Sequence, residues 1–240
     1  MQTAAQDDIT LPLHNWEALH QLEREKDYLS SVAGEIDVAS ITSGASLSSP
    51  EFLLLASRYK PLNLTTKLMR IIKVVNVLME EFSSQGIQIF PCVEVPGYNP
   101  IDLYVRFKGL THLLISIRSM GKSEIIYKEA NETLFVRRKG KGIKKWHPDP
   151  LVELSEYQAW LIKNRQQFGM PSREVRKPLA KVLLISGETT IDKHPEHLYA
   201  KISGEPYLAL NRKGTAFVIK EEQISNFIKA YLAMYQAQEA

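Results

Sequence analysis

Hydrophobic positions recur at helical spacing in several stretches of the chain. The predicted helices cover residues 14–32, 50–58, 65–82, 150–165 and 221–235. Thr65 or Thr66 supplies a capping hydroxyl for the third, and Gly34 is a plausible stop for the first. Asp149 followed by Pro150 is the expected start of the fourth, because proline fits the first helical position.

Shorter apolar runs, separated by turn residues, predict strands. These runs cover residues 87–95, 101–107, 112–118, 124–127, 133–138, 181–186, 207–210 and 216–219. The segment 211–214, Asn-Arg-Lys-Gly, predicts a hairpin turn between the last two. The order of elements predicts an α/β fold of the α+β type, with helices packed on a mixed β-sheet.

The N-terminal part differs from the rest in composition. Residues 1–13 are expected to be disordered, and residues 39–50, rich in Ser, Thr, Ala and Gly, are typical of a linker. We therefore predict two parts: an acidic helical and flexible segment at 1–60, and an α/β domain at 61–240.

Composition bears on membrane association and on the cellular compartment. No stretch approaches eighteen apolar residues, so no transmembrane helix is expected, and the acidic start lacks the features of a signal peptide. Cys92 is the single cysteine and cannot form an internal disulfide. We expect a cytoplasmic protein without a membrane partner.

Charge is distributed unevenly along the chain. Residues 1–60 have a net charge of −5 and residues 61–240 a net charge of +8, and the forty residues 106–145 alone carry +8. Such concentration favours a polyanionic partner, DNA or RNA. The alternative is a solvated basic face that only maintains solubility.

Two neighbouring predicted strands carry polar residues of a recognisable kind. Asp102 follows Pro100 at the start of one strand, and Ser116 and Arg118 lie on the next. With the opening helix and the later turn and helix around Gln158, this order resembles the restriction-endonuclease-like PD-(D/E)XK superfamily, especially its nuclease-related-domain branch. The resemblance covers about residues 64–232. It implies a nuclease-like, restriction-endonuclease-like core at 61–240 in which Asp102 binds Mg²⁺. The catalytic candidates are Asp102, Gln158 and, as a carboxylate on the preceding strand, Glu94.

The chain departs from that pattern where chemistry requires it. The family's third strand carries acid-x-Lys, and here Ser116 and Arg118 stand instead. Mg²⁺-dependent hydrolysis needs at least two carboxylates, and arginine cannot act as a base. Either catalysis is lost and Arg118 holds a phosphate, or carboxylates have moved. Candidates for such a move are Glu94, Glu153 and Glu156. Asp102 alternatively bonds turn amides only.

The segment 137–146 is the strongest charge signal, with six basic residues within nine followed by a tryptophan. The nucleic-acid-binding candidates are Arg118, Arg137, Arg138, Lys139, Lys141, Lys144, Lys145 and Trp146. The basic side chains would contact phosphates and Trp146 would stack on a base. The alternative places Trp146 under the following helix. His194 and His197 are expected to lie in a polar loop rather than to bind metal.

Three functions remain open from the sequence. The first is nucleic-acid binding on a catalytically degenerate nuclease-like fold. The second is a Mg²⁺-dependent DNA endonuclease with relocated carboxylates. The third is a protein-interaction module that docks a partner through its N-terminal helix. The oligomeric state is open.

Overall fold

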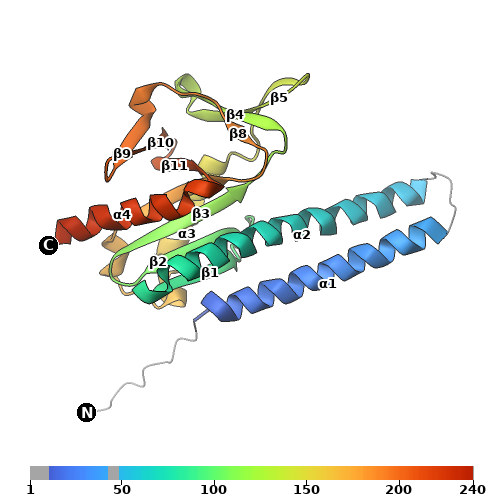
Figure 1. Ribbon diagram of the computed structural model, residues 1–240, viewed down its shortest axis with the longest axis horizontal. Coiled ribbons are helices and arrows are strands. Elements are labelled where there is room, and N and C mark those ends of the chain that lie inside the picture. The colour runs from blue at the N-terminus through green and yellow to red at the C-terminus, as the bar shows by residue number, and fades with distance from the viewer. Residues whose placement is uncertain (1–10, 43–48, 240) are drawn as a thin grey trace, which may run out of the picture.

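The computed structural model describes residues 11–42 and 49–239, and within them the fold is mixed α/β, as predicted (Figure 1). The larger sheet has the spatial order β1 (Ile87–Val93), β2 (Ile101–Phe107), β3 (Thr111–Arg118), β7 (Leu179–Ile185), β11 (Thr215–Lys220), β10 (Glu205–Asn211) and β9 (Tyr199–Ile202). The smaller sheet has the order β6 (Gly142–Lys145), β5 (Thr133–Arg138), β4 (Ser123–Lys128) and β8 (Thr190–Ile191).

The larger sheet is antiparallel at both ends and parallel in the middle. Strands β1, β2 and β3 form an antiparallel meander, and β7 and β11 run parallel to β3. Strand β10 pairs antiparallel with β11, and β9 pairs antiparallel with β10. Parallel neighbours need a crossover, and the β3 to β7 crossover contains α3 (Pro150–Lys163) and three strands of the smaller sheet, β4, β5 and β6. The polar ends of β2 and β3 therefore lie next to α3.

Helices cover both faces of the larger sheet. Helices α2 (Ser49–Phe82) and α4 (Ile224–Glu239) lie on one face, α3 lies on the other, and α1 (Asn15–Thr42) runs beside α2 (Figure 1). Strand β2 is buried on both sides: Leu103 and Val105 face α2, while Tyr104 packs with Tyr157 of α3. This double burial explains why the central strands are apolar almost throughout.

Local signals predicted many elements well. The limits of β2 and β5 agree with the prediction, and α3 begins at Pro150 with Asp149 Oδ1 accepting a hydrogen bond from Leu151 N at 3.1 Å. The apolar stripes of the helices expected at 65–82 and 221–235 are buried in one core. Strands β6, β8 and β9 were not predicted, because they are short and two of them lack buried side chains.

The helix limits predicted for the N-terminal part were wrong. Helix α1 continues through Gly34, and α2 runs through Pro61 as one helix where two had been expected. Of the expected linker 39–50, residues 43–48 lie outside the described residues, as do residues 1–10 of the expected disordered start. The two helices pack along each other, a tertiary contact that can outweigh the cost of one glycine within a helix.

The start of α1 belongs to the core of the domain. Leu19 and Leu22 are buried together with side chains of α2, and the Asn15 side chain bonds both Ile87 O at 2.9 Å and Ile89 N at 2.8 Å. Trp16, expected on the buried stripe, is 51% exposed instead. This packing argues against a folding boundary between residues 60 and 61.

Candidate functional site: the Asp102 network and the basic hairpin

Asp102 is buried and its carboxylate is surrounded by positive charge. One oxygen, Oδ2, accepts hydrogen bonds from Ile117 N at 2.7 Å and from Arg118 Nη1 at 2.6 Å. Lys67 Nζ of α2 lies 2.6 Å from the other oxygen, Oδ1. The side chain of Asp102 is only 1% exposed, so these ion pairs are shielded from water on the aspartate side. Both oxygens of the expected metal ligand thus contact cations.

Arg118 links this carboxylate to helix α3. Its Nη2 lies 3.2 Å from Glu153 Oε2, and Glu153 Oε1 accepts a hydrogen bond from Asn99 Nδ2 at 3.0 Å. Burial disfavours the charge on Arg118, but Asp102 and Glu153 outweigh it and raise its pKa. Burial, followed by the charge of Glu153, raises the pKa of Tyr157 to about 12, so this phenol stays protonated. We call Lys67, Asp102, Arg118 and Glu153 the Asp102 network.

The residues proposed to replace the missing family carboxylate fall in different places. Glu153 joins the network, one turn before Tyr157, whereas Glu156 pairs with Lys213 Nζ at 3.7 Å. Glu94 lines the cleft beside Asp102. The described residues contain no group of three His, Cys, Asp or Glu side chains placed to share a metal ion.

Two residues at the family's motif positions also lack the expected contacts. Ser116 stands opposite Asp102 on β3, and its buried hydroxyl has no hydrogen-bond partner in the described part of the chain. Gln158, the third catalytic candidate, makes no hydrogen bond to the network among the described residues, and its neighbour Tyr157 lies beside Arg118 instead. The helix predicted around Gln158 is present, and Tyr157 is the side chain of this pair that lies beside the network.

A cleft of about 810 Å³ opens beside the network, between the start of α1, α2 and the end of β1. Lys67, Asn99 and Asp102 line it together with mainly apolar side chains such as Leu64 and Phe90. Cys92 also lines it, and burial and the charge of Asp102 raise the pKa of its thiol to about 12. The thiol therefore stays protonated and is a poor nucleophile near neutral pH.

The basic segment forms a hairpin of β5 and β6. Strand pairing places Arg137 opposite Ile143 and Val136 opposite Lys144, so adjacent basic residues alternate between the two faces. Arg137 donates through Nε to Glu124 Oε2 at 2.7 Å and lies 3.7 Å from Asp192 Oδ2. Its charge is thus already balanced within the protein.

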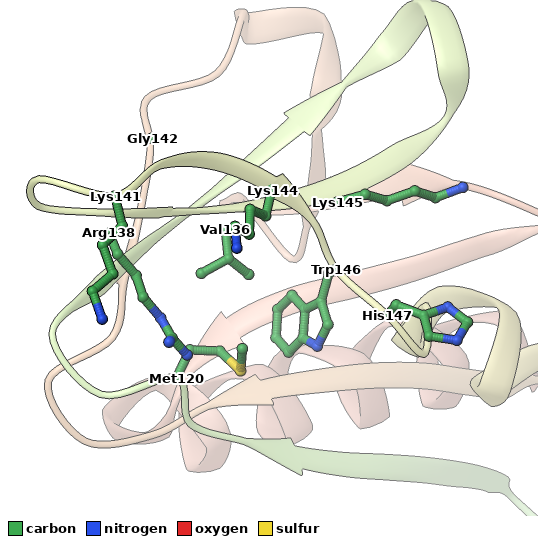
Figure 2. A pocket seen from close by; sticks show the side chains of 9 residues that line it. All are labelled: Met120, Val136, Arg138, Lys141, Gly142, Lys144, Lys145, Trp146 and His147. Carbon is green, nitrogen blue, oxygen red and sulfur yellow. The ribbon is translucent and has the colours of Figure 1, made fainter.

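The other basic side chains of the hairpin are exposed and have no ion-pair partner among the described residues. They are Arg138, Lys139, Lys141, Lys144 and Lys145. Trp146 is 5% exposed and packs in the core with Leu134 and Val136. The ring is therefore not the open stacking surface that was expected, and its small exposed part forms the floor of a small pocket (Figure 2).

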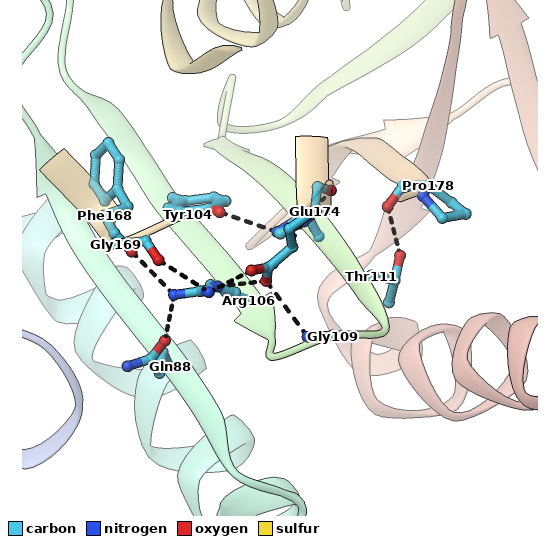
Figure 3. A network of polar contacts seen from close by, with 10 residues as sticks. Gln88, Tyr104, Arg106, Gly109, Thr111, Phe168, Gly169, Glu174 and Pro178 are labelled. Carbon is cyan, nitrogen blue, oxygen red and sulfur yellow. Dashed lines mark hydrogen bonds and ion pairs between the residues drawn. The ribbon is translucent and has the colours of Figure 1, made fainter. Parts of the chain in front are cut away.

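The remaining polar clusters have structural partners. His194 Nε2 accepts from Tyr127 N at 3.2 Å, and His197 Nε2 lies 3.0 Å from Glu129 Oε1, which agrees with the polar loop predicted for them. Sequence reasoning missed a buried ion pair between Arg106 of β2 and Glu174, with Nε and Oε1 at 2.6 Å (Figure 3). The two partners are 68 residues apart, so no local motif links them. The signal in the sequence was the position of Arg106 within the mainly apolar strand β2.

Comparison of the chain with protein-family models, curated proteins and solved structures gives no match. Within the described residues, no helix has both the length and the apolar character needed to cross a membrane. The proposed function therefore rests on the geometry of the Asp102 network and of the basic hairpin.

Proposed function

We propose that this protein binds nucleic acid through the β5–β6 hairpin and does not cleave it. The main support for this proposal is the set of five exposed hairpin cations without an ion-pair partner in the described part of the chain. Unpaired cations close together on one hairpin raise the local positive potential and attract a phosphate backbone. A face kept only for solubility does not need the charge to be concentrated in one hairpin, since both signs interspersed serve that purpose.

The contacts of the Asp102 network support the absence of cleavage. In the restriction-endonuclease-like scheme proposed for this core, Asp102 is a Mg²⁺ ligand. Here Lys67 and Arg118 contact its two oxygens, and a divalent ion would have to displace both cations from a shielded carboxylate. Ser116 in the position of the second acid offers only a weak ligand. The network supplies ionic bonding between α2, β2, β3 and α3 in place of a metal.

The test is the salt dependence of binding. Affinity for a labelled duplex should fall linearly with salt on logarithmic axes, by about 0.9 in slope for each phosphate contact. Replacing Arg138, Lys139 and Lys141 by alanine should flatten the slope by roughly 2–3 units. Fluorescence anisotropy between about 50 and 200 mM salt measures this change.

A matched control removes the same charge elsewhere. Lys163, Lys193 and Lys201 are exposed, lie outside the hairpin, and have no side-chain ion pair among the described residues. Their triple alanine variant should keep the wild-type slope. Equal slopes for wild type and the folded hairpin triple would remove the hairpin from the binding site, and absence of any salt-dependent binding would remove the proposed function.

A protein partner at the start of α1 is the second candidate function. Leu13 is 50% exposed, Trp16 is 51% exposed, and both lie where the chain enters α1. Tryptophan is enriched among the residues that anchor protein interfaces. A stable complex that survives nuclease treatment and is lost in Trp16→Ala would favour this candidate.

A further inference from the structure

The pocket under the basic hairpin combines an apolar floor with a charged rim. Trp146 and Val136 form the floor, and the Met120 side chain lies beside the Trp146 ring (Figure 2). Arg138, Lys141 and Lys144 belong to the rim, and Figure 2 shows Arg138 reaching over the pocket toward Met120. Two structural units meet here, the hairpin and the loop that follows β3.

The size of the pocket selects its ligand. It encloses about 200 Å³. A cavity of about 150 Å³ already holds a benzene ring, and drug-sized ligands occupy roughly 300–1,000 Å³. The space therefore suits one flat heteroaromatic ring rather than a larger molecule. Methionine and tryptophan are suitable contacts for such a ring because their surfaces are polarisable.

Strand geometry separates two neighbouring lysines of equal charge. Lys144 pairs with Val136 and lies on the same face as Trp146, whereas Lys145 pairs with Phe135 on the opposite face. In Figure 2 the Lys145 side chain extends away from the pocket. Both lysines line the pocket, but the Lys145 side chain points away from it, so a ligand in the pocket lies nearer the ammonium group of Lys144. A ligand attracted only by the net charge of the hairpin makes no such distinction.

We propose that this pocket takes one unpaired nucleotide of a bound strand. Its base lies against Met120 and Trp146, and its phosphate contacts Lys144, Arg138 and Lys141. This inference rests on the proposed nucleic-acid binding and adds a preference for single-stranded or frayed substrates. Bases of an intact duplex are stacked and paired, so their flat faces cannot enter the pocket, whereas an unstacked base can.

The experiment compares a labelled single strand of about 12 nucleotides with a blunt duplex of the same length. Lys144→Ala should weaken single-strand binding more than Lys145→Ala, whereas the two variants should weaken duplex binding equally. Met120→Trp fills the pocket from a half-buried position that can accept a larger side chain. It should weaken single-strand binding by about 10-fold, the size expected of one lost stacking contact, and leave duplex binding unchanged.

Free AMP identifies the source of the nucleotide. Weak competition by AMP, at millimolar concentration, agrees with a nucleotide held as part of a strand. Displacement of the strand by micromolar AMP would overturn the proposal in favour of a small-molecule site. Equal effects of Lys144→Ala and Lys145→Ala on single strands, while salt-dependent binding persists, would overturn the pocket but keep the proposed function. The lysine pair leaves the floor intact, so it decides the matter even where Met120→Trp fails to fold.

Discussion

Replacing Asp102 by alanine is expected to destabilise the fold substantially. The substitution removes the acceptor of the Ile117 amide at 2.7 Å, leaves Lys67 without its partner in the network, and leaves Arg118 paired with Glu153 alone. Arg118 is 17% exposed and Lys67 34% exposed, so water can partly solvate the lysine but reaches the arginine less easily. The larger part of the loss therefore comes from Arg118 and the unpaired amide.

The magnitude follows from these contacts. Breaking a buried ion pair by removing one partner costs about 3–5 kcal/mol, and a hydrogen bond to a charged group contributes about 1.5–3 kcal/mol within that sum. Because Lys67 is partly hydrated, its share stays below about 1 kcal/mol. We expect Asp102→Ala to lower the free energy of unfolding by about 3–4 kcal/mol. The melting temperature should fall by roughly 6–16 °C.

Urea unfolding followed by circular dichroism measures the loss, and two variants control it. Asp102→Asn keeps an acceptor for the Ile117 amide and should cost less than the alanine variant. Glu156→Gln removes one carboxylate charge from α3 and should cost under about 1 kcal/mol, because its pair with Lys213 is exposed. A metal-binding carboxylate behaves in the opposite way, since its removal relieves repulsion and often stabilises the protein. An Asp102→Ala variant as stable as the wild type would refute the network.

Three other outcomes are expected. Plasmid and single-stranded DNA should remain intact with Mg²⁺ or Mn²⁺, and metal-dependent cutting that disappears in Asp102→Ala would contradict the proposed loss of catalysis. Leu19→Ala should lower the free energy of unfolding by about 2–5 kcal/mol and Leu13→Ala by under about 0.5 kcal/mol, because Leu19 is 2% exposed and Leu13 50%; equal denaturation midpoints would place α1 outside the core. Burial lowers the pKa of His112, so below about pH 6.5 the unfolded chain binds a proton that the folded ring disfavours. The free energy of unfolding should therefore decrease as the pH is lowered through this range. His112→Gln should flatten that dependence in unfolding curves between pH 5 and 7, and an unchanged slope would exclude His112 as its source.

Elements with a strong local signal could be predicted from the sequence. Alternation and continuous apolar runs identified β2 and β5, and the pair of Asp149 and Pro150 identified the start of α3, because capping and proline geometry act within one helical turn. The extent of α1 and α2 could not be predicted in this way. A glycine and a proline are local stop signals, and the packing of the two helices against each other is not visible in local sequence.

The candidate sites divide along the same line. The concentration of positive charge in 137–145, and the placement of Asp102 and Arg118 on neighbouring strands, were visible in the sequence because both depend on short spacing.

Only the tertiary structure decided which charges meet. Lys67 reaches Asp102 from α2, Arg137 is neutralised by Glu124 across a strand pair, and Trp146 turns into the core. The physical reason is that an ion pair or a buried ring depends on distances between elements, which are set by sheet register and helix packing. The sequence by itself determined most of the elements and their charge, and the packing determined which of these charges are paired within the protein.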